Sequence, residues 1–126
     1  MTLTVLPDAF TVCKLHSLGD AAPVQTNGGI FFLSQTENEI SLVCSTAHAP
    51  KNTLARKDGW RAFHIAGQLD FSLIGILAEI SAILAHEGIG IFVVSTYNTD
   101  YVLTKAENLP HALAALQQAG HTIQYP

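Results

Sequence analysis

The chain has 126 residues, of which 48% are hydrophobic and 13% are charged, and its formal net charge is −4. This composition is typical of a compact globular protein and excludes an intrinsically disordered chain, which would have too little apolar surface to bury. A small negative charge without a basic patch gives no electrostatic reason to expect nucleic acid or an acidic membrane as a partner.

The sequence predicts a soluble protein of the cytoplasm. The N-terminus has no basic segment before a long apolar run and no cleavage-site pattern, so we expect no signal peptide. The longest apolar stretch contains charged residues, among them Glu79 and Glu87, and therefore cannot serve as a membrane span. Cys13 and Cys44 lie in β-like runs without CxxC spacing, so we expect buried, reduced thiols. A disulfide would require neighbouring strands of suitable geometry.

Short β-like runs dominate the first half of the chain. We expect strands at Thr2–Leu6, Phe10–Leu15, Ile30–Gln35 and Glu39–Cys44. Thr36-Glu37-Asn38 has the length and composition of a tight hairpin connection. The segment Gly19–Gly29 contains a proline and a Gly-Gly pair, so any helix there is short. This half is therefore β-rich and lacks one full helix.

Breakers and charged residues interrupt the pattern over Ala49–Gly59, which predicts a boundary between units at residues 1–58 and 59–126. The basic residues of the chain are scattered, apart from Arg56, Lys57 and Arg61 near this boundary. We interpret them as a solvated linker in preference to a phosphate-binding patch.

The second half shows the order strand, helix, strand, strand, helix, strand. The expected elements are Trp60–Ala66, a helix from near Ser72, Ile89–Ser95, Tyr101–Lys105, Glu107–Gln118 and His121–Tyr125. Ser72 can cap the first helix, and Gly88 lies where a left-handed C-cap is expected. Pro110 fits the first turn of the second helix, and Gly120 ends it. This βαββαβ order is that of the ferredoxin-like plan.

Several motifs resemble an ACT-domain subfamily that occurs as tandem ACT pairs and includes relatives of a cytosolic arginine sensor of animal cells. They are LDFS (Leu69–Ser72), STYNTDY (Ser95–Tyr101), GWRA (Gly59–Ala62) and FFLSQTENEISLVC (Phe31–Cys44). The resemblance covers nearly the whole chain. It implies an α+β fold of two tandem ACT-like units, each ferredoxin-like with an antiparallel sheet and helices on one face, the first unit being abbreviated in its helices.

The resemblance also implies a ligand site. In such sensors the ligand usually lies between the first strand–helix turn of one unit and strands of a neighbouring unit. The corresponding residues here are Gly67, Asp70, Phe71, Ser72, Leu73 and Ile74 in the strand–helix turn, and Ser95, Thr96, Tyr97 and Asp100 further along. Tyr97-Asn98-Thr99-Asp100 matches the aromatic-x-x-Asp element of the arginine sensor.

The chemistry of these residues suits an amino acid. Free amides at a helix N-terminus over Ser72–Ile74 would bind a carboxylate. Asp70 and Asp100 offer charge-assisted acceptors for an ammonium or guanidinium group. Gly67 would let the backbone approach the ligand closely. Tyr97 could cover an aliphatic side chain or stack on a guanidinium.

Each of these residues also has a structural alternative, which the sequence leaves open. Ser72 can be an N-cap alone, and Asp70 can serve its turn through side chain-to-backbone bonds. Asp100 can belong to a hydrogen-bonded loop, and Tyr97 can pack at a strand end. The conformation of the backbone can require Gly67 by itself.

We expect no catalytic residue, no metal and no cofactor. The six histidines form no HxH or HxxxH pair, and no glycine-elbow serine is present. The leading hypothesis is a regulatory protein without its own catalytic domain that binds an amino acid or a similar small metabolite. It would act as a homo-oligomer such as a dimer, or through an unidentified protein partner.

Two other hypotheses stay open. One is an interaction module that dimerises through its ACT sheets without a ligand, and the less favoured one is a small enzyme that uses Asp70 and Asp100. A swap of the Thr2–Leu6 strand between units or between chains also stays open.

Overall fold

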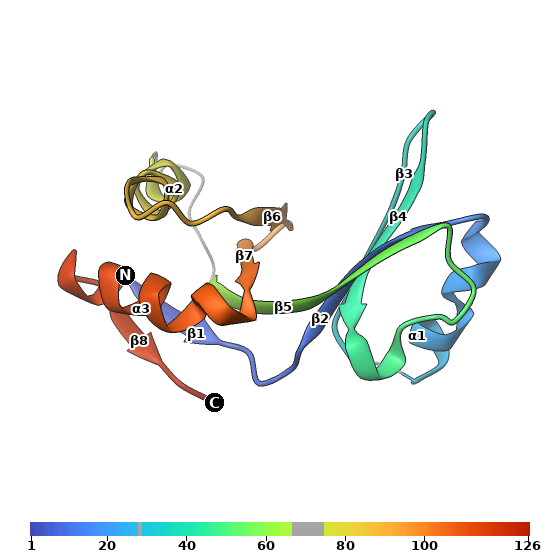
Figure 1. The fold of residues 1–126 in the computed structure, drawn as a ribbon, viewed down its shortest axis with the longest axis horizontal. Coiled ribbons are helices and arrows are strands. Elements are labelled where there is room, and N and C mark those ends of the chain that lie inside the picture. The colour runs from blue at the N-terminus through green and yellow to red at the C-terminus, as the bar shows by residue number, and fades with distance from the viewer. Residues whose placement is uncertain (28, 67–74) are drawn as a thin grey trace. The chain divides into compact units, whose positions relative to one another are not determined.

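The computed structural model describes residues 1–27, 29–66 and 75–126, and its helices and strands are drawn in Figure 1. The predicted α+β class is confirmed. The chain forms two compact units, which we call the C-terminal unit (Met1–Pro7 with Arg61–Pro126) and the N-terminal unit (Asp8–Trp60). The assignment of separate ACT-like units to residues 1–58 and 59–126 stays a prediction.

The described residues of the N-terminal unit form a four-stranded antiparallel sheet with short helical segments. Its elements are β2 (Phe10–Leu15), η1 (Leu18–Ala21), α1 (Ala22–Asn27), β3 (Phe31–Gln35), β4 (Ile40–Ser45), η2 (Thr46–His48) and the first half of β5 (Ala55–Ile65). The strand order is β3-β4-β2-β5. Its core consists of Cys13, Leu15, Ala21, Val24, Leu42 and Cys44. The abbreviated helical content predicted for this half is therefore present.

The strand β5 corrects our interpretation of Arg56, Lys57 and Arg61 as a solvated linker. All three residues lie in β5, whose first half runs antiparallel to β2 with Cys13 opposite Arg56. A β-bulge interrupts the register between Lys57 and Trp60. Gly59 has a φ of +85° there, a left-handed conformation that glycine adopts without strain. The glycine and charges that resemble a linker in sequence thus belong to a bulged strand.

In its described residues the C-terminal unit contains two α-helices, one short 3₁₀ helix and a five-stranded sheet. Its elements are β1 (Thr2–Val5), the second half of β5, α2 (Ile76–His86), β6 (Phe92–Ser95), β7 (Asp100–Lys105), η3 (Ala106–Asn108), α3 (Leu109–Gln118) and β8 (Thr122–Gln124). The strand order is β8-β1-β5-β7-β6. Buried residues of both helices, such as Leu84 and Leu116, share one core with strand residues such as Phe63 and Val102. The two helices therefore cover the same face, as the ferredoxin-like plan predicts.

The first strand of the chain lies inside the sheet of the C-terminal unit. β1 is antiparallel to β5 and parallel to β8, so that Leu3 has Ile65 opposite it on one side and Ile123 on the other. All three side chains are buried. The β1 strand thus separates the first and last strands of the βαββαβ series, a position that the sequence left open.

Both described helices of the C-terminal unit end as predicted. Gly88 and Gly120 have φ values of +73° and +102°. After α2, Ile89 N donates to Leu84 O at 2.9 Å and Gly88 N to Ala85 O at 3.0 Å, which is a Schellman motif. The amides of Gly120 and the residue after it make the same pair of bonds at the end of α3. Among the described residues, no helix combines the length and apolar character that a membrane span requires.

The position of β1 yields a stability prediction. We expect Leu3→Ala to lower the free energy of unfolding by about 2–5 kcal/mol, because the side chain is fully buried between two neighbouring strands. The same change at Leu54, which is 55% exposed, is the control and should cost within about 0.5 kcal/mol. Urea denaturation followed by circular dichroism measures both values. Equal losses of unfolding free energy in the two variants would show that the burial of Leu3 in β1 does not stabilise the core.

Candidate ligand-binding site

The turn between β6 and β7 is closed by one threonine. Ser95 and Asp100 are paired across the two strands, which leaves the four-residue loop Thr96–Thr99. Thr96 N donates to Thr99 O at 2.8 Å, and the Thr96 hydroxyl donates to the same carbonyl at 3.0 Å. The amide of Thr99 in turn donates to the Thr96 hydroxyl oxygen at 3.3 Å. Backbone and side chain thus hold the loop in one conformation.

A buried hydrogen bond attaches this turn to the end of β5. The Thr99 hydroxyl donates to the Ile65 carbonyl at 3.1 Å, and Thr99 is only 8% exposed. Ile65 is the last residue of β5, and the amide of the next residue, Ala66, donates to Thr2 O at 2.8 Å. The β6–β7 turn is therefore fixed at the point where the chain leaves β5 for the connection to α2.

The structure brings four of the predicted ligand-binding residues together in this turn, namely Ser95, Thr96, Tyr97 and Asp100. The Ser95 hydroxyl donates to Asp100 Oδ1 at 2.5 Å. The Tyr97 side chain is 79% exposed, whereas Asp100 is half-buried. The other six predicted residues lie outside the described residues, namely Gly67, Asp70, Phe71, Ser72, Leu73 and Ile74.

The geometry leaves the Asp100 carboxylate able to accept further hydrogen bonds. A carboxylate has about four lone-pair positions, and Ser95 occupies one of them. The Ser95 bond also orients the carboxylate, so less side-chain freedom is lost when a cation binds. A positively charged group of a ligand could therefore bind here through charge-assisted hydrogen bonds.

Sequence reasoning missed the residues that hold the turn in place. Thr99 was read only as part of the loop, although its hydroxyl supplies the buried bond to β5. The rings of His64 and Tyr101 lie 5.1 Å apart at a 36° angle and add a contact between β5 and β7 beside the turn. No local pattern marks such contacts, since they join residues that are distant in sequence.

The N-terminal unit contains an equivalent turn between β3 and β4. Gln35 and Ile40 are paired across the strands, and Thr36 N donates to Glu39 O at 2.9 Å. The Thr36 hydroxyl accepts from the amides of the last two loop residues at 3.2 Å each. A short 3₁₀ helix follows the second strand of the hairpin in both units: η2 follows β4, and η3 follows β7. The structure thus shows an internal repeat that was not evident in the sequence.

The two turns differ in the residues that could bind a ligand. Gln35 and Ile40 occupy the places that Ser95 and Asp100 have in the C-terminal unit. The oriented carboxylate is therefore a feature of the C-terminal turn and is not needed for the turn to form.

Comparison with known proteins assigns the family. A family model of the ACT domain matches residues 55–118, which is more than half of the chain. The chain belongs to the ACT domain family. ACT domains are typically ligand-binding regulatory domains, so this much of the predicted function is established at the level of the family.

Solved structures resemble this ACT-domain protein along nearly its full length. A protein from Agrobacterium tumefaciens is 28% identical to it, with a TM-score of 0.86 over 99% of this chain and 92% of that chain. A Vibrio cholerae protein of unknown function, described as a possible transport protein, is 19% identical, with a TM-score of 0.70 over 93% and 88% of the two chains.

The regulatory subunit of aspartate kinase from Thermus thermophilus, in its ligand-free form, is 14% identical, with a TM-score of 0.65 over 94% and 96% of the two chains. At this identity, as with the Vibrio protein, the likeness concerns the fold alone.

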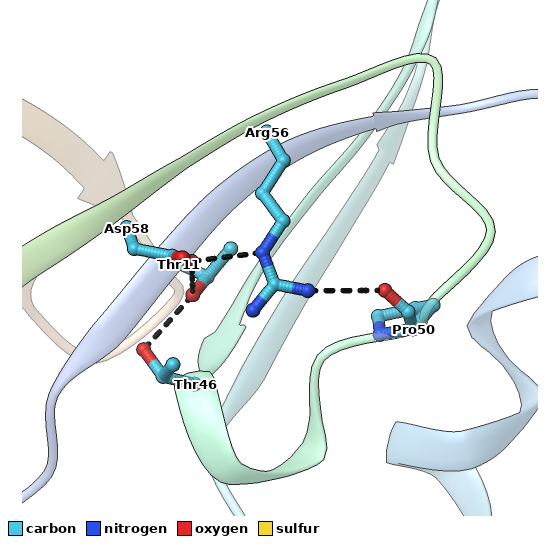
Figure 2. Close-up of polar contacts among 5 residues, drawn as sticks. All are labelled: Thr11, Thr46, Pro50, Arg56 and Asp58. Carbon is cyan, nitrogen blue, oxygen red and sulfur yellow. Dashed lines mark hydrogen bonds and ion pairs between the residues drawn. The ribbon is translucent and has the colours of Figure 1, made fainter.

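A second polar cluster lies in the N-terminal unit of the ACT-domain protein (Figure 2). Asp58 Oδ1 accepts hydrogen bonds from the Thr11 hydroxyl at 2.6 Å and from Arg56 Nε at 2.9 Å. Because the single hydroxyl proton of Thr11 goes to Asp58, the Thr46 hydroxyl must be the donor in its 2.9 Å contact with Thr11. Arg56 Nη1 also reaches Pro50 O at 3.4 Å. The cluster connects the bulge of β5 to β2 and to η2.

Cys13 and Cys44 are buried free thiols, which confirms the predicted burial. Cys44 lies opposite Thr11 in the β2–β4 register, so the two cysteines are diagonal neighbours. Burial raises the pKa of the Cys44 thiol to about 11 and also raises the pKa of Cys13. Because the thiolate is the reactive form, both side chains are core residues with little nucleophilic character at neutral pH.

The cluster around Asp58 predicts how acid affects stability. Hydrogen bonds from Thr11 and then Arg56 hold the pKa of the Asp58 carboxyl below its ordinary value of 3.8. The carboxylate therefore stabilises the folded state above that value, and this stabilisation is lost as the pH falls through the folded pKa. We expect Asp58→Asn to be less stable at neutral pH and to lose less stability on acidification.

Thermal unfolding at several pH values between about 5 and 3 tests this. Asp8→Asn, which also removes one exposed carboxylate, is the control. If the wild type and Asp58→Asn lose the same amount of stability on acidification, the cluster does not lower the pKa of Asp58.

Proposed function

We propose that this protein is a regulatory ACT-domain protein that binds an amino acid or a similar small metabolite at the β6–β7 turn. The observation that carries the proposal is the Ser95–Asp100 pair on a turn that Thr99 fixes to the end of β5. The equivalent turn of the N-terminal unit forms without such a pair. An oriented carboxylate that the fold does not require is best explained by recognition of a ligand.

In this proposal each end of an amino acid has its own partner. Asp100 accepts hydrogen bonds from the ammonium group or from a basic side chain. The exposed ring of Tyr97 covers the aliphatic part or stacks on a guanidinium. The carboxylate would bind in the strand–helix turn, where the resemblance assigns Gly67 and residues 70–74. The resemblance to an arginine sensor makes arginine one ligand to test and does not select it over others.

The proposed output is a change of assembly and not a reaction. A ligand that binds one arrangement of ACT units more tightly than another shifts the equilibrium by the difference in its binding free energy. The arrangement would be a homodimer or a complex with a separate protein partner. We place this function in the cytoplasm, where the free thiols of Cys13 and Cys44 would stay reduced.

A second candidate function is assembly without a ligand, and the β6 strand favours it. In the part of the chain that the structure describes, β6 pairs only with β7 and forms an edge of the sheet. Its sequence, Phe92–Ser95, is FVVS and contains no charged residue or proline of the kind that usually protects an edge strand. A second copy of the chain could therefore extend the sheet at β6.

A thermal-shift screen against the twenty amino acids tests the binding proposal. We expect one or a few of them to raise the Tm by on the order of 10 °C at about 100 times the Kd, because the ligand binds only the folded state. Asp100→Ala should remove the shift while leaving a folded protein. Glu37→Ala removes an exposed carboxylate from the equivalent N-terminal turn and should keep the shift.

Two outcomes would contradict the proposal. An unchanged shift in Asp100→Ala would place the ligand away from the β6–β7 turn. A flat screen, for protein shown by mass spectrometry to carry no ligand, together with a stable dimer in size-exclusion chromatography, would favour assembly through β6.

A further inference from the structure

A cavity of about 320 Å³ lies in the C-terminal unit, away from the β6–β7 turn. It is bounded by the end of β1, the start of the second half of β5, one side of α3 along its length and the residues after β8. The residues that matter for its chemistry are Val5, Arg61, Leu109, Leu113 and Tyr125.

Arg61 contributes a charge to this cavity that lacks a counter-charge among the described residues. Its Nη2 donates to the backbone carbonyl of Leu6 at 3.0 Å, which is a neutral partner. Its Nε is buried and has no hydrogen-bond partner in the described parts of the chain. Within the same residues, no carboxylate lies in ion-pair distance of Arg61. Buried polar groups are normally satisfied, so an unfilled donor on a residue that lines a cavity requires an explanation.

The remaining walls are mainly apolar. Val5, Leu109 and Leu113 are each at most 6% exposed, and the ring of Tyr125 forms an open side at 62% exposure. The cavity therefore combines one positively charged side chain, Arg61, with mainly apolar walls.

We propose that this cavity binds a small carboxylate with an apolar body, the carboxylate on the Arg61 guanidinium and the body along Leu109, Leu113 and Tyr125. An anion supplies the charged partner that Arg61 lacks, through the charge-assisted hydrogen bonds that a guanidinium forms with carboxylates. The residues that line the cavity include no aspartate or glutamate, so an ammonium group would find no acidic side chain there. The site should thus favour carboxylic acids that lack an amino group over amino acids.

This site is independent of the β6–β7 turn, where the proposed ligand group is a cation on Asp100. The two proposals can therefore fail separately. Resonances of Val5 and Leu113 report the cavity, whereas resonances of Ser95 and Thr99 report the turn.

The test is a nuclear magnetic resonance titration of the full chain with phenylacetate and hexanoate, each compared with its neutral amide. We expect the carboxylates to shift the methyl resonances of Val5, Leu109 and Leu113, and the amides to bind at least tenfold more weakly. Phenylalanine, which adds an ammonium group to a similar body, should shift these methyl groups less than phenylacetate does.

Two variants locate the site. Arg61→Gln should weaken carboxylate binding at least tenfold, whereas Lys14→Gln, an equal loss of charge at an exposed position of the N-terminal unit, should leave it unchanged. Ala114→Phe keeps Arg61 and fills the cavity from its exposed rim, so it should also abolish the shifts. The second variant keeps the test valid if Arg61→Gln does not fold.

The proposal is overturned if the acids and their amides bind equally, since the charge of Arg61 would then play no part. It is also overturned if binding survives in both Arg61→Gln and Ala114→Phe, or if millimolar phenylacetate and hexanoate leave the cavity methyl groups unshifted.

Discussion

The insertion of β1 between β5 and β8 is the constraint on which the C-terminal unit depends. Neighbouring strands lie about 4.8 Å apart, so without β1 its two neighbours would face a gap too wide for ladder hydrogen bonds. Both would then expose unpaired backbone groups beside the core. The ends of β1 also serve the two proposed sites. Thr2 O binds the amide of Ala66 at the end of β5 near the β6–β7 turn, and Leu6 O, just after β1, binds Arg61 at the cavity.

The two units share one turn geometry but differ in the residues that flank it. Thr36 and Thr96 close their turns with similar hydrogen bonds, so this geometry belongs to the repeated fold. Only the C-terminal turn of the pair adds an oriented carboxylate, at Asp100. In the N-terminal unit a polar cluster around Asp58 holds a bulged strand to its neighbours. The carboxylate that we propose as a ligand contact and the polar cluster around Asp58 thus lie in different units of one ACT-domain protein.

Local signals account for what sequence reasoning predicted correctly. The predicted strands of the first half end within one residue of β1 to β4, because their apolar pattern and turns are local. Gly88 and Gly120 mark helix ends because a left-handed residue strongly favours glycine. The same reasoning was wrong at Arg56, because Gly59 and the charged residues near it resemble a linker in sequence. A bulge allows a strand to contain such residues, and only pairing with β2 reveals it.

The sequence by itself determined the α+β class, the order of most elements and the motif that contains Ser95 and Asp100, because these depend on residues close together in the chain. The tertiary structure alone decided that β1 joins the C-terminal sheet, that Thr99 fixes the turn to Ile65, and that Arg61 meets an apolar cavity. Each of these joins segments that are far apart in sequence. Such contacts form because they bury a whole apolar face and give particular buried polar groups their hydrogen-bond partners. No local sequence pattern indicates which distant segment supplies the partner.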